Sequence, residues 1–191
     1  MQIKVLAISG SSRQGSVNTQ LLCAGIAIAR ALGAEVTHLD LRALALPLYD
    51  GDLEATGGLP EGCIALKSAL SSHHALLVAS PEYNGFFTPL FKNAIDWASR
   101  PQEGQSSPFA GKVAGLLAAS PGALGGIRGL PSVRHLLSNL GVLVTPGQMS
   151  LPGALKAFNA QGGLLDTVQN QMLERVIKEL LATAQAMQAK A

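Results

Sequence analysis

The sequence has few aromatic residues, few charged residues and no long apolar run. Of its 191 residues, 4% are aromatic and 14% are charged, while 48% are hydrophobic. So apolar a chain is not typical of a disordered protein. No apolar stretch approaches the roughly 20 residues of a membrane-spanning helix, so we expect no membrane span. The net charge of +2, with no basic run, gives little support to nucleic-acid binding.

Cysteine and targeting signals are also scarce. The chain has two cysteines, Cys23 and Cys63, and neither belongs to a CxxC motif, so no metal site or dithiol chemistry is indicated. Both lie in helix-like stretches, where we expect buried thiols. The amino-terminus lacks a charged lead followed by a small-residue cleavage site, because Met1 runs directly into an apolar stretch. The expected location is therefore cytoplasmic.

Apolar runs alternate with helix-like segments along the whole chain. Strands are predicted at residues 3–9, 34–40, 74–80, 112–120 and 142–151. Helices are predicted at residues 17–32, 61–72, 87–99, 129–140 and 165–187. The last helix carries an apolar stripe of Leu165, Val168, Met172, Val176 and Leu180. Residues 41–59, which contain proline and several glycines, are predicted to form a long loop.

This uninterrupted alternation predicts an α/β fold of three layers, with helices on both faces of one parallel sheet. Five strands fit the flavodoxin-like order 2-1-3-4-5, whereas a Rossmann domain would have a sixth strand. No repeat or linker divides the chain, so residues 1–191 are expected to form a single domain. Ligands of such sheets bind at the carboxyl ends of the strands, where the strand order reverses. Three unusual loops follow neighbouring strands there, at residues 9–18, 80–86 and 120–126.

The first loop, GSSRQGSVN, has the composition of an anion-binding site. It precedes a helix, whose first backbone N–H groups lack helical partners, and it contains hydroxyls, one arginine and no carboxylate. The loop lacks the lysine of GxxxxGK[ST], and Ser12 breaks the GxGxxG pattern. No cysteine precedes Arg13, so it is not a tyrosine-phosphatase loop either. A phosphate site is therefore indicated; the alternative is a serine-rich turn with an ordinary helix cap.

The other two loops suit a flat ligand. Five of the eight aromatic residues lie between Ser80 and Pro101: Tyr83, Phe86, Phe87, Phe91 and Trp97. They indicate contact with a planar ligand or with another subunit, unless the helix simply belongs to the core. The stretch SPGALGG has three glycines, which allow a backbone to lie flat against a ring, although it could also be a flexible loop. A phosphate pocket beside a planar slot predicts a mononucleotide such as FMN.

Taken in order, GSSRQGSVN, PEYNGFFTPLFKNAIDW and SPGALGG closely resemble the NADPH-dependent FMN reductase family, over about residues 2–185. The resemblance implies bound FMN, with NADPH or NADH as electron donor. The cofactor-binding residues that it implies are Ser11, Arg13, Ser16, Val17, Asn18 and Thr19 in the first motif, Pro81, Glu82, Tyr83, Asn84 and Gly85 in the second, and Ser120, Pro121, Gly122, Gly125 and Gly126 in the third.

The same resemblance implies hydride transfer from NAD(P)H to FMN and then to a quinone, flavin, chromate or azo-type acceptor, in a ping-pong scheme. Because the chemistry resides on the flavin, no catalytic side chain is expected. The four histidines, His38, His73, His74 and His135, are interpreted as structural. Relatives form dimers or tetramers, so a homodimer or dimer of dimers is expected. The alternative is a flavodoxin-like electron carrier; such carriers are usually acidic, unlike this chain. The role of Glu82 stays open.

Overall fold

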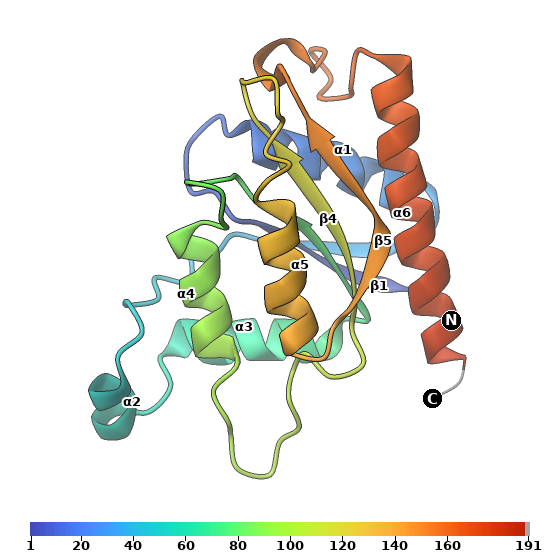
Figure 1. Ribbon diagram of the computed structural model, residues 1–191. Coiled ribbons are helices and arrows are strands. Elements are labelled where there is room, and N and C mark those ends of the chain that lie inside the picture. Colours follow the sequence, from blue (N-terminus) through green and yellow to red (C-terminus); the bar gives the residue numbers. More distant parts are fainter. Residues whose placement is uncertain (190–191) are drawn as a thin grey trace.

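The computed structural model describes residues 1–189, in which strands and helices alternate along the chain (Figure 1). The strands are β1 (Lys4–Ser9), β2 (Glu35–Leu39), β3 (Ala75–Ala79), β4 (Val113–Ala119) and β5 (Leu143–Leu151). The helices are α1 (Val17–Ala31), α2 (Gly51–Gly57), α3 (Glu61–Ser72), α4 (Pro89–Ala98), α5 (Leu130–Asn139) and α6 (Thr167–Gln188), with a short 3-10 helix, η1 (Ala154–Lys156), after β5.

The five strands form one parallel sheet in the order β2-β1-β3-β4-β5, which confirms the predicted topology. The chain leaves β1 toward β2 on one side of the sheet and later returns to β3 on the other, so the order reverses at β1. Backbone hydrogen bonds continue just beyond the strands, from Gly10 N to Ala79 O at 2.8 Å and from Ser80 N to Leu117 O at 3.0 Å. The loops after β1, β3 and β4 therefore start side by side.

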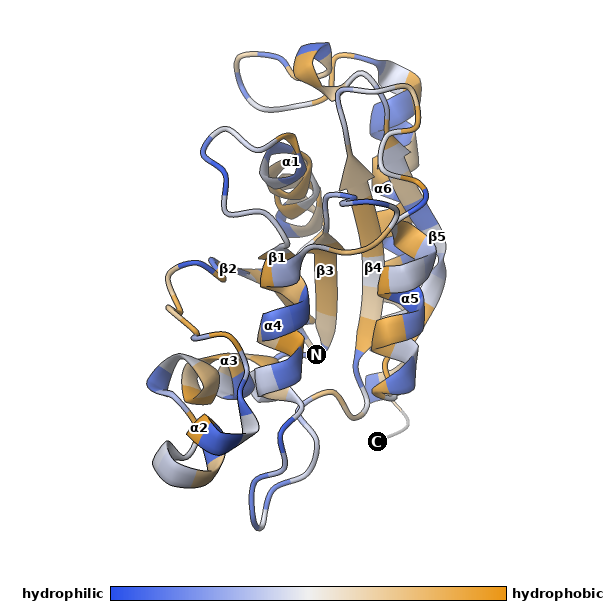
Figure 2. Ribbon diagram, turned by 60° about the vertical axis from the view of Figure 1, so that its left-hand side comes forward, coloured by the Kyte–Doolittle hydropathy of each residue, from blue (hydrophilic) through white to orange (hydrophobic). Residues whose placement is uncertain are grey.

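Two hydrophobic cores lie on opposite faces of the sheet. Val5 and Ala7 of β1 face the core formed with α1 and α6, while Leu6 and Ile8 face the core formed with α3, α4 and α5. Figure 2 shows the apolar strands between helices whose outward sides are hydrophilic. Fully burying one such side chain contributes about 1.5–3 kcal/mol, so a sheet covered on both faces is strongly favoured for this apolar chain.

The predicted long loop contains a helix. Residues Gly51–Gly57 form α2, which starts where the Asp50 carboxylate accepts hydrogen bonds from the backbone N–H groups of Asp52 and Leu53. No residue of α2 is buried. The apolar periodicity used to predict helices was therefore absent, and only the acidic cap could have indicated this one.

The apolar face of α6 was only partly predicted. Val176 and Leu180 are buried as expected, but Leu165, Val168 and Met172 are 63%, 64% and 45% exposed. The face that packs on the sheet consists of Leu173, Val176, Ile177, Leu180 and Ala184. The helix starts only at Thr167, and its first turns precede the part that packs on the sheet.

One further expectation about burial was wrong. Cys63 is buried, but Cys23 is exposed on α1. The aromatic side chains of α4 belong to the core, one of the alternatives that the sequence left open, since Phe91 is 1% exposed and Trp97 is fully buried. Within residues 1–189, no helix is both long enough and apolar enough to cross a membrane.

Candidate functional site

Three loops that are far apart in the sequence surround one cavity at the carboxyl ends of β1, β3 and β4. The cavity has a volume of about 180 Å³. Its lining residues are Ser11, Arg13, Ser16, Val17, Asn18, Pro81, Glu82, Tyr83, Ala119, Ser120 and Pro121. Most of the residues expected to bind a cofactor thus meet in one place. Ala119 was not expected there; it is the last residue of β4.

The amino-terminus of α1 forms the most polar end of this cavity. Ser16 caps the helix, and its hydroxyl accepts a hydrogen bond of 3.4 Å from the backbone N–H of Thr19. The backbone N–H groups of Gln14, Gly15 and Val17 donate to no acceptor within residues 1–189. The first turn carries no acidic residue. Unpaired N–H groups at the positive end of a helix dipole form an anion site, and Arg13 adds a full positive charge beside them.

Asn18 lies at the same helix terminus but uses its side chain differently from what we expected. Its Nδ2 donates to Ala119 O at 2.8 Å, and its Oδ1 accepts from Ala119 N at 2.9 Å. Both the amide and Ala119 are buried, at 2% exposure each. The side chain therefore joins the start of α1 to the end of β4. Thr19 does not line this cavity, and its hydroxyl lies 2.9 Å from that of Ser9.

The loop after β3 makes a tight turn beside the cavity. Tyr83 and Phe86 exchange two backbone hydrogen bonds, of 2.9 and 3.0 Å. Asn84 and Gly85 between them have φ values of 54° and 84°, a conformation that asparagine and glycine tolerate best. Both lie outside the cavity lining. The turn instead holds Tyr83, which is 53% exposed, at the mouth of the cavity.

Glu82 forms an ion pair within the chain. Its Oε1 accepts from Nε and Nη2 of Arg128 at 2.7 and 2.6 Å, and its Oε2 accepts from the Arg128 backbone N–H at 3.1 Å. The carboxylate side chain is only 7% exposed. Gly129 lets the two segments approach, because a Cβ there would lie 3.2 Å from the Glu82 Cβ. The pair ties the loop after β3 to the segment before α5 and neutralises the one acid in the cavity lining.

The glycines after β4 serve the packing of the loop on the sheet. A Cβ on Gly125 would lie 2.7 Å from backbone atoms of Leu151 and Pro152, and its φ is 61°. A Cβ on Gly126, where φ is 83°, would lie 3.0 Å from the Ala118 Cβ. Neither residue lines the cavity, and nor does Gly122. Glycine is thus required at residues 125 and 126 by close approach to β4 and β5.

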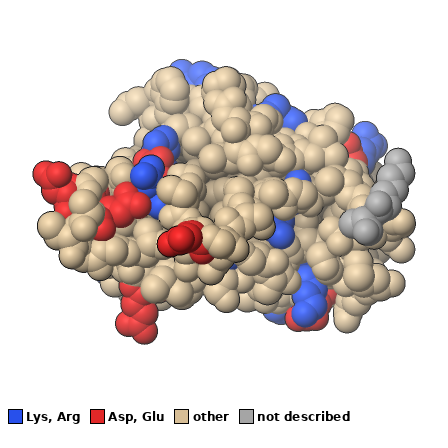
Figure 3. Space-filling model, turned by 90° about the horizontal axis from the view of Figure 1, so that it is seen from below, with Lys and Arg blue, Asp and Glu red and all other residues tan. Residues whose placement is uncertain are grey.

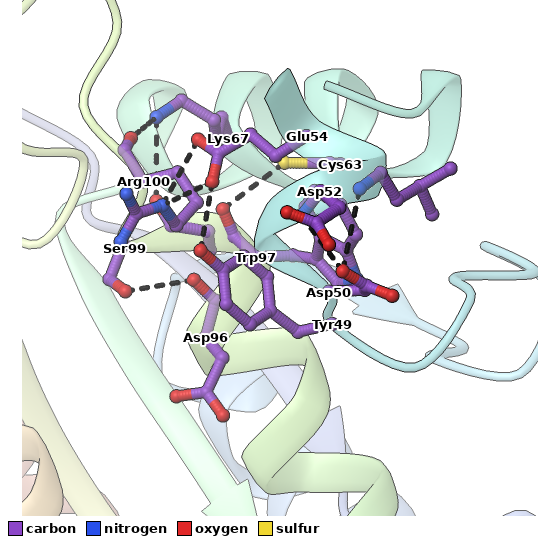
Figure 4. Close-up of polar contacts among 12 residues, drawn as sticks. Tyr49, Asp50, Asp52, Glu54, Cys63, Lys67, Asp96, Trp97, Ser99 and Arg100 are labelled. Atoms are coloured by element: carbon purple, nitrogen blue, oxygen red, sulfur yellow. Dashed lines mark hydrogen bonds and ion pairs between the residues drawn. The ribbon is translucent and has the colours of Figure 1, made fainter. Parts of the chain in front are cut away.

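A second polar cluster, away from the cavity, fastens residues 41–60 to α4 (Figure 4). The Glu54 carboxylate accepts from Arg100 Nε at 2.8 Å and from the Tyr49 hydroxyl at 2.9 Å. These hydrogen bonds hold the pKa of Glu54 below its ordinary value of 4.5; the one from Arg100 has the larger effect and the one from Tyr49 the smaller. Deeper in, Lys67 Nζ donates to Arg100 O at 2.6 Å, and burial raises the pKa of the Cys63 thiol. The Glu54 carboxylate, the Tyr49 hydroxyl and the Lys67 ammonium are all paired within the cluster, so we assign it a structural role.

Two other kinds of site would be a metal site in residues 1–189 and a charged patch on the face seen in Figure 3. Residues 1–189 contain no group of three or more histidine, cysteine, aspartate or glutamate side chains that could hold a metal ion. On the face seen in Figure 3, basic and acidic side chains occur in small separate groups among uncharged atoms.

Comparison with known proteins identifies relatives along nearly the whole chain. Residues 3–156 match the protein family described as NADPH-dependent FMN reductase. An NAD(P)H-dependent FMN reductase of Pseudomonas aeruginosa is 37% identical over 179 residues, which cover 93% of each chain. An NADPH:quinone oxidoreductase of Arabidopsis thaliana is 34% identical over 98% of this chain and 95% of its own. Among solved structures, the flavoenzyme NAD(P)H:(acceptor) oxidoreductase FerB of Paracoccus denitrificans superposes with a TM-score of 0.83 at 27% identity, covering 97% of this chain and 98% of its own.

Proposed function

The chain belongs to the NADPH-dependent FMN reductase family and is an oxidoreductase, and we propose that it holds FMN in the cavity at the ends of β1, β3 and β4 and reduces a quinone with electrons from NAD(P)H. The convergence of three loops on one cavity, with an acid-free helix terminus at one end, carries this proposal. Flavin, chromate and azo compounds are further candidate acceptors, and the two half-reactions would alternate in a ping-pong scheme.

The residues of the cavity fit FMN in their donor set. The free N–H groups before and at the start of α1, together with Arg13 and Ser11, suit the phosphate, because guanidinium and amide donors match its oxygens. Pro81, Tyr83 and Ser120 line the opposite part of the cavity, where the ring would lie. The Arg128 pair keeps the Glu82 carboxylate from repelling an anionic ligand. When bound, FMN supplies the two-electron acceptor and donor that no side chain of the cavity can provide.

In this proposal, the residues of the chain bind and orient FMN and stabilise its charge. The Asn18–Ala119 and Glu82–Arg128 contacts hold the three loops at fixed separations, so the cavity is formed before the ligand arrives. Backbone donors of the loop after β4 are candidates for stabilising the negative charge of a reduced flavin, as expected from its position before α5.

A spectroscopic and kinetic experiment tests this function. Purified protein should show the absorbance of bound flavin, and NADPH or NADH should bleach it without oxygen. Steady-state oxidation of NADPH with a benzoquinone should then proceed without a partner protein and give parallel lines in double-reciprocal plots. A bound flavin that neither nucleotide reduces would instead support an electron carrier, and intersecting lines would contradict the ping-pong scheme.

We also propose that the chain forms a homodimer or a dimer of dimers. With Phe91 and Trp97 buried, the support comes from apolar side chains exposed on the loops around the cavity, notably Phe86 at 60% and Leu124 at 53%. Sedimentation at micromolar concentration should show a species at least twice the chain mass of 19.7 kDa; a monomer throughout would contradict this. The cytoplasmic location stays a prediction, which cell fractionation tests.

A further inference from the structure

A second and larger cavity adjoins the first on the other side of the loop after β1. Its volume is about 510 Å³, within the range of small-molecule sites. Ser11, Arg13 and Ser16 line both cavities, so the two cavities meet at the loop that is proposed to hold the FMN phosphate. The FMN site proposed above does not use the rest of the lining, which includes Asp40 and Arg42.

The charged groups of this second cavity come from the carboxyl end of β2. Arg42 donates its backbone N–H to Asp40 Oδ1 at 2.9 Å, and its Nη1 lies 3.5 Å from Ser12 O. This turn places a guanidinium and a carboxylate next to each other at the cavity. Arg13 and His38 are the other basic groups in the lining. His38, which we interpreted as structural from its position in β2, is exposed there.

The segment that carries Arg42 is anchored at its far end. The Glu54–Arg100 pair fastens the following residues to the segment just after α4 (Figure 4). Asn93 Nδ2 donates to Pro47 O at 2.8 Å and fastens them to α4 itself. A side chain presented from an anchored segment loses less conformational entropy on binding than one on a free loop. The end of β2 is therefore suited to recognise a polar group.

We propose that this second cavity binds the adenosine end of the pyridine nucleotide, with Arg42 pairing with the 2′-phosphate of NADPH and Asp40 accepting a hydrogen bond from the ribose hydroxyl of NADH. Guanidinium forks match phosphate, and a carboxylate can accept a hydrogen bond from a ribose hydroxyl. The presence of both groups would allow either nucleotide to bind. The inference rests on the proposed function, since the nicotinamide must reach the flavin in the adjoining cavity.

A binding experiment tests the assignment without turnover. Protein saturated with FMN is titrated calorimetrically with adenosine 2′,5′-bisphosphate and with adenosine 5′-monophosphate. The bisphosphate should bind at least about tenfold more tightly, as expected for one charge-assisted phosphate contact. Arg42→Ala should abolish that difference and Arg42→Lys should retain part of it. The control Arg175→Ala removes an exposed arginine of α6 and should change nothing. Equal affinities in the parent protein, or an unchanged difference in Arg42→Ala, would overturn the proposal.

Steady-state kinetics supply a second test, in which each of two variants is assayed with both NADPH and NADH. Arg42→Ala should raise KM for NADPH about 10- to 100-fold and leave KM for NADH and both kcat values nearly unchanged. Asp40→Asn should raise KM for NADH more than KM for NADPH. Arg42→Ala could retain FMN and NADH-driven flavin reduction while the KM values for NADPH and NADH shift equally or not at all. In that case this assignment fails and the proposed function stands. A parent protein that binds no FMN would instead refute the function itself.

Discussion

Replacing Asn18 with alanine is expected to destabilise the fold and weaken FMN binding together. The Asn18 amide makes two hydrogen bonds, of 2.8 and 2.9 Å, to the backbone of Ala119, and both residues are 2% exposed. The variant leaves one buried N–H and one buried C=O without partners. Each such group costs about 1–3 kcal/mol. Water entering the vacated space recovers part of this, so we expect the free energy of unfolding to fall by about 2–4 kcal/mol.

Urea unfolding and FMN titration measure the two effects. The same contact joins the start of α1 to the end of β4, on opposite sides of the cavity, so FMN affinity should fall by about tenfold or more at a temperature where the variant is folded. Asn139→Ala is a matched control, because that amide is exposed and, among residues 1–189, its side chain hydrogen-bonds to His135 alone, at 3.1 Å. A urea midpoint for Asn18→Ala equal to that of the control would show that the Asn18–Ala119 hydrogen bonds do not stabilise the fold.

Three further outcomes follow from the geometry. Gly125→Ala should lower the free energy of unfolding by at least about 2 kcal/mol, because residue 125 has a φ of 61° and the new Cβ would lie 2.7 Å from backbone atoms. The control Gly122→Ala should change little, because its Cβ would meet no atom closer than 3.8 Å. Equal urea midpoints for the two variants would contradict this prediction. Arg128→Met should remove the guanidinium partner of the Glu82 carboxylate, leave it only the backbone N–H of residue 128, and cost about 1–2 kcal/mol. A double-mutant cycle with Glu82→Gln measures this, and additive effects would argue against the pair. The folded-state pKa of Glu54 lies below its ordinary 4.5, so the stabilisation from this carboxylate is present above that pH and is lost as the pH falls through the folded-state value. Urea midpoints measured from about pH 6 to about pH 3 should therefore decline more steeply for the parent protein than for Glu54→Gln. Parallel declines would contradict a stabilising role of the ionised Glu54.

The sheet order was predictable because the three central strands, β1, β3 and β4, are buried on both faces. Near-continuous apolar runs such as residues 74–80 identify parallel strands, and their alternation with helices leaves few topologies. Helix α2 was not predicted because it buries no residue and therefore shows no apolar periodicity. The stripe on α6 was misassigned at its start because periodicity does not show where a helix begins to contact the sheet.

The meeting of the three loops was predictable for the same topological reason, but the role of several residues within them was not. Asn18 pairs with a backbone 101 positions away, and Gly125 approaches the end of β5 too closely for a side chain. Such contacts depend on how the loops pack over the strand ends. The Asp40–Arg42 turn carries no motif, and it became a candidate only when folding placed it at a cavity.

The central claim is that the loop and helix terminus after β1 bind the phosphate of FMN. Calorimetric titration of FMN-free protein with FMN and with riboflavin, which lacks only the phosphate, tests it most directly. We predict that FMN binds at least about 100-fold more tightly, and that this ratio falls by about tenfold or more in the Arg13→Ala, Ser16→Ala double variant. Equal affinities for FMN and riboflavin, or the same ratio in the double variant as in the parent, would contradict the claim.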